Sequence, residues 1–539
     1  MNPGLRMPDA VPSARREWIL PVAAGLSVAL LQFWFVAVTG TGVPVDDQWE
    51  VEGAQLYPLF SEGMLRFADL WRAHNEHRIL WTKLADTVLF SVNGQWDPLV
   101  QLFAIIGLRA VVAGGLAAAL AKRAEEGMRL ATCLVVAWLF LPHLAWHNVI
   151  WGFQSHVYFS LGFSLLAFWF FADGPLTPPR WAAGVACGAA AQLGMAAGAF
   201  VPVALFALVI LRLAGLRSRA AGLTAGEAAS NAAPAGGLGI CGDWGRPMTT
   251  LLWLGLGAIL LGGMAALLGA GVPGNEALRA KTAGAFLKAF GLGLAWPYPG
   301  NPWVGLAACL PFGLVVVLRL TGRRKPAAGE DYVLLMGFFA LAAAIAQAAM
   351  RGGGDEFAER VPSRYAEFFV PWVLANCWCV WSVCAAAAPG RKFLIRVGGA
   401  AWLVLLLSGW LAATAETWRG IVLPRMEYQA VPAQLARAYQ ATGDARVFAG
   451  YPRLLVASQS PETSMWPVLR DPRMRGRLPP ALQPGLPMGW MSTAVRWMCR
   501  HHVAILLSSI LPVLLLVVTG VCDLKPGARS RGSPEANPT

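Results

Sequence analysis

Long apolar runs recur along the whole chain and are separated, with few exceptions, by short polar links. A helix needs roughly 20 apolar residues to cross the hydrocarbon core of a bilayer, and most of these runs approach that length. The pattern therefore predicts an all-α, polytopic membrane protein with about twelve transmembrane helices. The expected spans are 18–40, 98–121, 130–146, 156–172, 181–197, 199–213, 249–270, 303–320, 331–350, 367–388, 397–415 and 501–522.

Basic residues mark one side of the predicted bundle. If the N-terminus lies in the cytoplasm, alternate links carry most of the clustered lysines and arginines, as the positive-inside rule predicts. These links contain Lys122, Arg123, Arg180, Arg212, Arg217, Arg219, Arg323, Arg324, Lys325, Arg391 and Lys392, with Lys525 and Arg529 in the C-terminal tail. One link, 221–247, is rich in Ala, Gly, Ser, Asn and Pro and is predicted to be a flexible cytoplasmic linker.

The opposite, external side then receives the segments 41–97, 147–155, 271–302, 351–366 and 416–500. Every unusual polar cluster of the chain falls in one of them, whereas the cytoplasmic links contain little beyond Arg, Gly, Ala and Pro. We therefore expect the functional site at the external ends of the helices.

Two external segments are long enough to have structure of their own. Within 41–97, apolar residues recur at helical spacing between charges, which predicts helices lying in the membrane interface. The other segment is predicted to be a small α/β unit, with a helix at 428–442, a short strand at 446–449 and irregular chain at 461–484. The domain boundaries that follow are 1–415 for the transmembrane domain, 416–500 for the external segment, and 501–539 for the final span and cytoplasmic tail.

Composition and charge indicate which classes of protein and of binding partner can be excluded. The 539 residues have a mean hydropathy of +0.52, with 56% hydrophobic and 14% charged residues, which excludes an ordinary soluble protein. The formal net charge is +13, but the basic residues follow the membrane topology and no nucleic-acid-binding motif accompanies them, so no nucleic acid partner is expected. Most of the nine cysteines lie in apolar runs, and we interpret them as core residues rather than as a disulfide framework.

The first candidate for chemistry is the pair Asp46 and Asp47, just after the first apolar run. Two adjacent carboxylates beside a membrane can bind a divalent cation such as Mg²⁺ or Mn²⁺, or deprotonate an acceptor hydroxyl. Acidic residues at the start of a loop can equally serve only to solvate it. We take Asp46 and Asp47 as candidate catalytic residues and as candidate metal ligands.

A second polar cluster, from His74 to Arg78, lies in the same segment. On a helix His74 and His77 would share a face, but their spacing is not that of an HExxH zinc motif. We expect His74, Glu76, His77 and Arg78 to bind hydroxyl or phosphate groups of a substrate. The alternative is a polar helix face in the headgroup region.

Further candidates come from the other external segments. Arg351 ends one apolar run and Arg364 begins the next, so both guanidiniums are expected at headgroup depth, where arginine binds phosphate in bidentate geometry. Alternatively, these arginines snorkel and pair with Glu359 or Glu367. Candidate substrate-binding residues on the same side are also Gln154, Lys281 and Tyr365.

The order of these parts resembles the GT-C superfamily of membrane glycosyltransferases, which use polyprenyl-phosphate-linked sugars on the non-cytoplasmic side of the membrane. The resemblance covers roughly 18–415 and includes a group of poorly characterised bacterial membrane proteins. The last external segment is small beside the large periplasmic domains of many members. The motifs that carry the resemblance are Asp46-Asp47 after the first span, Asn75-Glu76-His77-Arg78, Trp151-Gly152-Phe153-Gln154 and Ser363-Arg364-Tyr365.

The resemblance implies a glycosyltransferase in the bacterial cytoplasmic (inner) membrane, with its active site on the extracytoplasmic face. Its partners would be membrane lipids, a polyprenyl-phosphate sugar donor, and a glycan, lipid or protein acceptor. One of Asp46 and Asp47 would act as base toward the acceptor hydroxyl. Arg351, Arg364 or Lys281 would stabilise the charge that develops on the leaving lipid phosphate.

Two other classes of function stay open on the sequence alone: a transporter or flippase of lipid-linked glycans, and a non-catalytic subunit of an envelope assembly. A transporter is disfavoured because no internal repeat relates the two halves. Ionisable residues deep in the spans are also scarce, apart from Arg109, whose partner is not evident from sequence. Loss of activity in a folded Asp46 or Asp47 variant would separate an enzyme from both alternatives.

Overall fold

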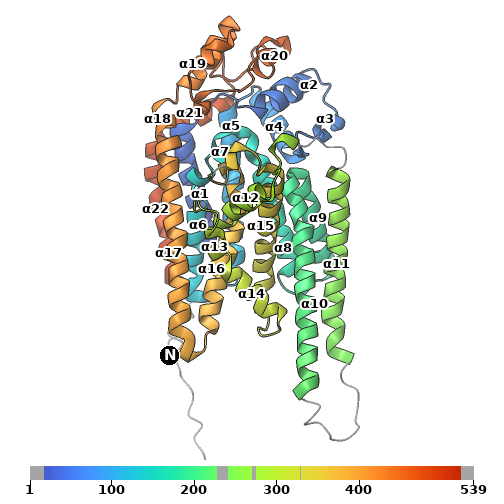
Figure 1. Ribbon diagram of the computed structural model, residues 1–539. Helices are drawn as coiled ribbons and strands as arrows, with labels where there is room; N and C mark the ends of the chain where they lie inside the picture. Colours follow the sequence, from blue (N-terminus) through green and yellow to red (C-terminus); the bar gives the residue numbers. More distant parts are fainter. Residues whose placement is uncertain (1–16, 227–240, 270–274, 328, 358, 524–539) are drawn as a thin grey trace, which may run out of the picture.

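The computed structural model describes residues 17–226, 241–269, 275–327, 329–357 and 359–523. These residues form helices and turns but no β-strand, and their only β pairing is an isolated bridge between His74 and His77. Figure 1 shows the long helices side by side, with short helices gathered above one end of the bundle. The all-α prediction is therefore confirmed for the described part of the chain.

Nine helical stretches in the described ranges are long and apolar enough to cross a membrane, which indicates a multi-pass membrane protein. They are α1 (Ile19–Thr39), α5 (Pro98–Ala121), α8 (Ser155–Ala172), α10 (Phe200–Gly226), α11 (Cys241–Gly269), α15 (Glu330–Arg351), α16 (Ala366–Ala386), the continuous stretch of α17 (Lys392–Thr417) and α18 (Leu423–Glu427), and α22 (His502–Asp523).

Three of the twelve predicted spans are not single long apolar helices. Around 130–146, the stretches Glu126–Leu139, which contains α6 (Arg129–Leu139), and Pro142–Ile150, which ends in α7 (Trp146–Ile150), meet at a bend of 40°. Proline cannot continue the helical hydrogen bonding, so Pro142 accounts for this break. The other two positions hold the 17-residue α9 (Pro178–Gly194) and the short helices α13 (Val304–Ala308) and α14 (Leu310–Leu320). The described residues thus support nine spans, or ten with the bent pair.

Small residues bring the first two spans together. A Cβ atom on Gly25 of α1 would lie 2.9 Å from the carbonyl oxygen of Ala110 and 3.4 Å from the Cα of Gly114, both on α5. Only glycine allows two backbones to approach so closely, as is common where helices pack inside membranes. The contact holds the first half of α1 close to α5.

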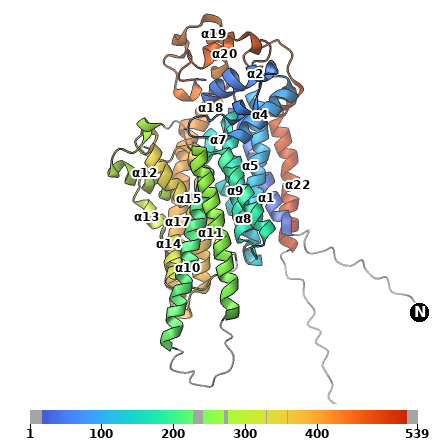
Figure 2. The same cartoon turned by 90° about the vertical axis from the view of Figure 1, so that its right-hand side faces the viewer.

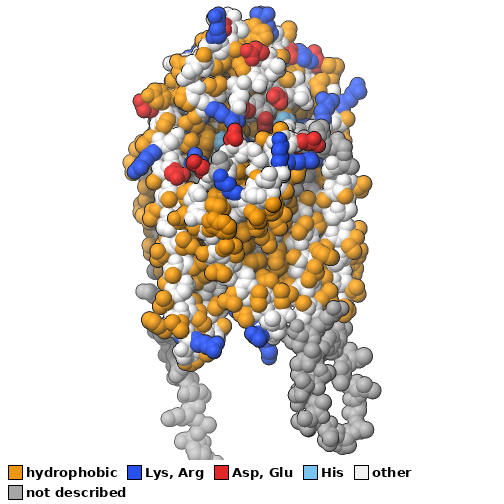
Figure 3. Space-filling view, viewed as in Figure 1, with side chains coloured by type: hydrophobic (Ala, Val, Ile, Leu, Met, Phe, Trp, Pro, Cys, Tyr) orange, Lys and Arg blue, Asp and Glu red, His pale blue; other side chains and the backbone are white. Residues whose placement is uncertain are grey.

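The two ends of the bundle differ in the charged side chains that they expose in one view of the surface. Figure 3 shows an apolar belt around the bundle, with charged side chains of both signs above it, at the end that carries the short helices. Below the belt, the charged side chains visible in this view are Lys and Arg. This distribution is the one that the positive-inside rule predicts when the lower end faces the cytoplasm.

The first and last external segments pack into one cap with a shared apolar core (Figure 2). The first contributes the π-helix η2 (Trp49–Leu56) and helices α2 (Tyr57–Ser61), α3 (Phe67–Trp71) and α4 (Leu80–Asn93). The last contributes α19 (Val431–Thr442) and α20 (Met465–Arg470), and α21 (Trp490–Arg500) leads down to α22. Core residues from both segments include Trp49, Tyr57, Phe90, Trp96, Tyr439, Phe448, Met465 and Val468.

The cap differs from the sequence prediction in two respects. The strand expected at 446–449 overlaps a 3-10 helix, η12 (Ala445–Phe448), so the expected α/β unit is helical in the structure. Helix α4 was expected to lie in the membrane interface; in the structure its Phe90 is buried in the cap core, while Val88 remains 59% exposed. The burial of Phe90 arises because the two external segments cover each other, which neither segment shows when it is considered alone.

Candidate functional site

Most of the predicted site residues line a single cavity of about 360 Å³ between the bundle and the cap, here called the carboxylate cavity. It collects residues from all five segments that were predicted to be external. Arg78 and Lys281 are the two predicted residues that do not line it. The predicted residues that do are Asp46, Asp47, His74, Glu76, His77, Gln154, Arg351, Arg364 and Tyr365.

Asp46 is held in an unusual backbone conformation by the cap. Its φ is +41°, in the left-handed region that non-glycine residues rarely occupy. The main-chain N–H of Asp46 donates to the carbonyl oxygen of Ala457 at 2.9 Å, and the N–H of Gln459 donates to the Asp46 carboxylate at 3.3 Å. Such strain persists only where the surroundings enforce it, and it is common at functional sites.

The two adjacent carboxylates have different environments. Burial raises the pKa of Asp46, against the lowering effect of the nearby Arg453 charge. Burial would also raise the pKa of Asp47, but a hydrogen bond from His74 and the positive charges around it prevail and leave that pKa below its usual value. The His74 Nε2 atom lies 3.5 Å from Asp47 Oδ2. Asp46 is therefore the better proton acceptor of the two, and Asp47 stays ionised.

The cluster from His74 to Arg78 is a tight turn rather than a helix face. The main-chain N–H groups of His74 and His77 each donate to the other residue's carbonyl oxygen, at 2.8 and 2.9 Å, and Asn75 between them has a φ of +46°. The turn directs His74 toward Asp47. Burial lowers the pKa of His77 to about 4, so its imidazole is neutral at physiological pH and can donate or accept a hydrogen bond.

Glu76 joins this turn to the transmembrane bundle. Its carboxylate pairs with Arg351, the last residue of α15, at 2.7 Å and accepts the main-chain N–H of Asn275 at 3.0 Å. These two donors hold the pKa of Glu76 below its usual value, although burial opposes them. The charge of Arg351 is thus largely neutralised by Glu76, and this arginine is less suited to hold a phosphate than the sequence indicated.

The remaining predicted residues divide into two groups. Arg364 lies at the start of α16 with its guanidinium 5.0 Å from the centre of the Tyr365 ring, and both line the cavity together with the buried Gln154. Arg78 instead donates to the carbonyl oxygens of Trp71 and Leu268, away from the cavity. Lys281 is an exposed residue just before α12 (Ala283–Ala295).

A buried polar network packs against Gly152, between two residues that line the carboxylate cavity, and it was not predicted from the sequence. The fully buried carboxylate of Glu52 accepts hydrogen bonds from Trp96 at 2.8 Å, Gln101 at 2.9 Å and Tyr57 at 3.3 Å. Burial nevertheless raises the pKa of Glu52 to about 7. The only sequence signal was the spacing of Gln48 and Glu52 by four residues, which places them on one helix face.

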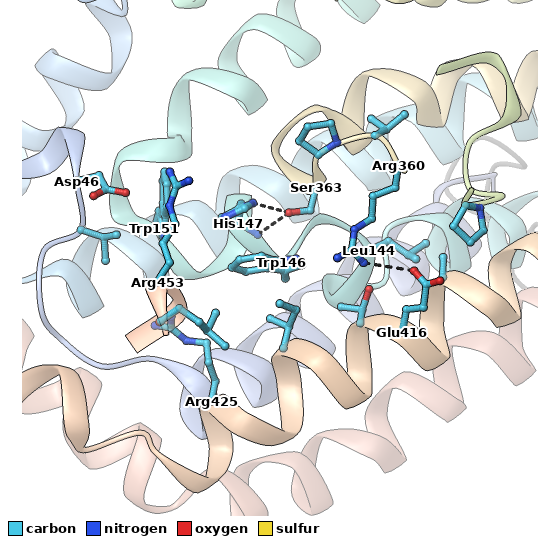
Figure 4. Close-up of a pocket in the computed structure, with 18 of the residues that line it drawn as sticks. Asp46, Leu144, Trp146, His147, Trp151, Arg360, Ser363, Glu416, Arg425 and Arg453 are labelled. Carbon is cyan, nitrogen blue, oxygen red and sulfur yellow. Dashed lines mark hydrogen bonds and ion pairs between the residues drawn. The ribbon is translucent and has the colours of Figure 1, made fainter. Parts of the chain in front are cut away.

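A second cavity, of about 500 Å³, adjoins the first and shares Asp46, Trp151 and Arg453 with it. We call it the aromatic cavity because Trp146, Trp151, Trp296 and Tyr298 line it. Figure 4 shows Asp46, Trp151 and Arg453 at one end of it, with His147 bonded to Ser363 and Arg360 paired with Glu416 further along. The His147 Nδ1–Ser363 Oγ distance is 2.7 Å, and the Arg360–Glu416 distance is 3.3 Å.

The residues around Asp46 and Asp47 do not form a clear metal site. Among the described residues there is no group of three or more His, Cys, Asp or Glu side chains placed to hold an ion. Magnesium and similar cations take about six oxygen ligands. The Asp46 carboxylate instead accepts the N–H of Gln459 and lies near the positive charge of Arg453, which disfavours a cation beside it. We therefore derive no step through the divalent cation that the sequence suggested.

Comparison with known proteins gives no assignment for this chain. No protein-family model matches it, and neither a curated protein nor a solved structure does. The function must therefore be argued from the geometry of the two cavities.

Proposed function

We propose that this protein is a membrane glycosyltransferase that moves a sugar from a polyprenyl-phosphate-linked donor to a hydroxyl-bearing acceptor at the extracytoplasmic face of a bacterial inner membrane. The observation that carries the proposal is the gathering of two adjacent carboxylates with opposite pKa shifts, three histidines and three arginines in one cavity between the bundle and the cap. These are the groups that base-assisted transfer away from a phosphate requires.

In the proposed reaction, Asp46 accepts the proton of the acceptor hydroxyl. The acceptor oxygen forms a bond to the anomeric carbon of the sugar, and the bond from that carbon to the phosphate oxygen breaks. The electron pair of this bond leaves with the lipid phosphate, which gains negative charge. A pKa above the usual aspartate value makes Asp46 a stronger base than an exposed carboxylate.

Asp47 and His74 have a supporting role in this scheme. Asp47 remains ionised beside His74, so the pair can orient sugar or acceptor hydroxyls without taking up the transferred proton. His77, which is neutral at physiological pH, supplies a further hydrogen-bonding group in the same cavity. Holding both substrates between the cap and the bundle contributes proximity, which is a major part of the rate enhancement of such transfers.

The test is transfer of label from a panel of radiolabelled polyprenyl-phosphate sugars by the purified protein, in detergent with bacterial lipid and envelope extract as acceptor. Asp46→Asn is expected to abolish transfer and Asp47→Asn to reduce it, with both variants folded. The matched control is Asp444→Asn, a half-buried cap residue outside both cavities; asparagine can still accept the N–H of Arg446 and loses only the surface ion pair with that arginine. Equal transfer by wild type and Asp46→Asn would refute the proposal, and so would donor binding without transfer by any form.

A further inference from the structure

Arg425, on α18, is a buried cation without a carboxylate partner. Its side chain lines the aromatic cavity, and the residue is only 5% exposed. Its Nη1 donates to the carbonyl oxygen of Leu454 at 2.7 Å, and its Nε donates to that of Thr39 at 3.4 Å. Within the described ranges no acidic side chain pairs with Arg425, and its Nη2 donates to no protein atom. Carbonyl dipoles only partly offset the cost of burying a full charge, so this guanidinium is suited to bind an anion.

Other charges in the aromatic cavity favour an anion at its inner end. Arg453 stands between Arg425 and Asp46 in Figure 4, and the charges of Arg425 and Arg453 both act on the His147 ring. Asp46 apart, the carboxylates of this cavity belong to the exposed residues Asp355, Glu359 and Glu416, at its rim. An anion at the inner end would therefore meet two guanidiniums at the boundary with the carboxylate cavity.

The walls of the same cavity suit an apolar chain attached to that anion. A separate narrow crevice of about 20 Å³ shares Trp296, Pro297 and Tyr298 with the aromatic cavity and is also lined by Trp402, Leu405 and Leu406 of α17. In the stretch Pro389–Glu427, which contains α17, only 6% of the most apolar window is buried within the protein. The crevice thus runs beside a helix that faces the bilayer. Ala413, Thr417 and Ile421 of the same helical stretch line the aromatic cavity itself, so a ligand with its charged head there could direct a hydrocarbon tail along α17 toward the bilayer.

We propose that the aromatic cavity binds the phosphate group of a lipid phosphate, with Arg425 as its main ligand and the hydrocarbon chain leaving along α17. The choice of an isoprenoid lipid for the test rests on the proposed function. The anion site itself is inferred from the burial and hydrogen bonding of Arg425 and does not depend on that function. The proposal moves the phosphate from Arg351, Arg364 and Lys281, where the sequence placed it, to the neighbouring cavity. The sugar would then project past Arg453 toward Asp46.

Binding of farnesyl phosphate to the purified full-length protein tests this assignment directly. Wild type is expected to bind farnesyl phosphate at least tenfold more tightly than uncharged farnesol or inorganic phosphate, since both the head and the chain contribute. Arg425→Met is expected to weaken farnesyl phosphate binding about tenfold to a hundredfold, which is the effect of losing a hydrogen bond to a charged group, and to leave farnesol binding unchanged. The matched control is Arg437→Met on α19, whose guanidinium likewise donates to a main-chain carbonyl oxygen, that of Ala481, but lines neither cavity; it should bind like wild type.

Three outcomes would overturn the assignment. Unchanged farnesyl phosphate affinity in Arg425→Met would exclude Arg425 as the phosphate ligand. Equally tight binding of glucose 1-phosphate would point to a soluble sugar phosphate instead of a lipid. Equal losses in Arg437→Met and Arg425→Met would indicate a diffuse electrostatic effect with no built site.

A second measurement covers the case in which Arg425→Met does not fold. A photoreactive farnesyl phosphate is expected to cross-link wild type at Trp296, Tyr298 or the lower part of α17, and farnesyl phosphate should compete while farnesol should not. Cross-links confined to the carboxylate cavity would refute the proposal. Neither experiment measures transfer, so their failure is separate from failure of the proposed function. Conversely, if Arg425→Met loses transfer but keeps its affinity for farnesyl phosphate, the assignment of Arg425 as the phosphate ligand is wrong, while the proposed transferase function is unaffected.

Discussion

Asp46 and Asp47 are neighbours in sequence, yet their chemistry diverges because their side chains meet different partners. The backbone of Asp46 turns through a positive φ, so its carboxylate meets the cap at Gln459, whereas that of Asp47 meets His74. The result is one carboxylate with a raised pKa and one with a lowered pKa within a single cavity. This separation is what allows two identical side chains to have different roles.

The pKa of Asp46 predicts how transfer depends on pH. A base works only when it is deprotonated, so the rate should fall as the pH is lowered through the pKa of Asp46, at a pH above the usual aspartate value of 3.8. The Arg453 charge lowers this pKa, so Arg453→Gln should move the acidic limb of the pH–rate profile to higher pH. Arg446→Gln, an exposed cap arginine, is the control and should leave the limb in place. A shift to lower pH in Arg453→Gln would contradict the assignment of Asp46 as the base.

Arg109 was identified from the sequence as an ionisable residue inside a span, but its ion-pair partner could not be predicted. It is fully buried and pairs with Glu367 at 3.0 Å, and the Tyr158 hydroxyl donates to the same carboxylate oxygen at 3.1 Å. Neither Arg109 nor Glu367 lines the carboxylate cavity or the aromatic cavity. The pair therefore joins α5 to α16 inside the bundle and has no direct contact with either candidate site.

This buried pair leads to a prediction about stability. Glu367→Ala would leave the Arg109 guanidinium uncompensated and should cost about 3–5 kcal/mol of the free energy of unfolding. Glu62→Ala removes one partner of the exposed Glu62–Arg473 pair and should cost less than about 1 kcal/mol. Unfolding of both variants in mixed detergent micelles, followed by circular dichroism, makes the comparison. Similar small losses in the two variants would show that the Arg109–Glu367 pair is not buried as described.

At the level of elements, the turn between α7 and α8 is fixed by close packing against the polar network. A Cβ atom on Gly152 would lie 2.6 Å from the side-chain oxygen of Gln101 and 3.0 Å from the side-chain nitrogen of Gln48. The Trp151-Gly152-Phe153-Gln154 motif therefore requires glycine at its second position. The motif was noticed in the sequence, but its steric reason lies in residues from two other segments.

Gly152→Ala is accordingly expected to destabilise the protein, by about 1–3 kcal/mol, because the added methyl group forces the network apart. Gly107→Ala in the middle of α5 is the matched control, since a Cβ there meets no atom within 4 Å and alanine favours a helix. The control should be neutral or slightly stabilising in the same unfolding measurement. A neutral Gly152→Ala would mean that Gln48 and Gln101 do not pack under this turn.

Element boundaries were predictable to the extent that local pattern determines them. The long apolar runs fixed α1, α5 and α15 closely, because lipid-facing and buried positions alike are apolar in a membrane. The predicted span at 130–146 is interrupted at Pro142. The predicted span at 181–197 corresponds to α9, which has only 17 residues and is not among the helices long and apolar enough to cross a membrane. The expected strand at 446–449 is a 3-10 helix because Asp444 caps it through the main-chain N–H of Arg446.

At the scale of the whole molecule, the site exists because the first and last external segments share one core. Trp49 and Tyr57 come from the first segment, and Tyr439 and Met465 from the last, yet they pack in a single cluster. The sequence could place Asp46, His74 and Arg351 on the same side of the membrane, because topology follows from apolar runs and basic links. It could not bring Arg425 or Arg453 to Asp46, because no local pattern specifies a contact across almost 400 residues.

The orientation of the whole molecule is open to a labelling test. Arg446→Cys lies in the exposed part of the cap, and Arg391→Cys lies in the exposed link before α17 at the opposite end. In intact spheroplasts, a membrane-impermeant maleimide should label Arg446→Cys above the wild-type background and should reach Arg391→Cys only after permeabilisation. The reverse pattern would place both cavities on the cytoplasmic face and would refute the proposed location.

The most direct test of the central claim is the configuration at the anomeric carbon of the product. If Asp46 acts as a base in a single displacement, the new bond forms on the face opposite the leaving phosphate, and NMR of the purified product should show inversion relative to the donor. Retention would require a covalent sugar–enzyme intermediate or a different mechanism and would contradict the role given to Asp46. Inversion by wild type, with no product from Asp46→Asn, is the result that this structure predicts.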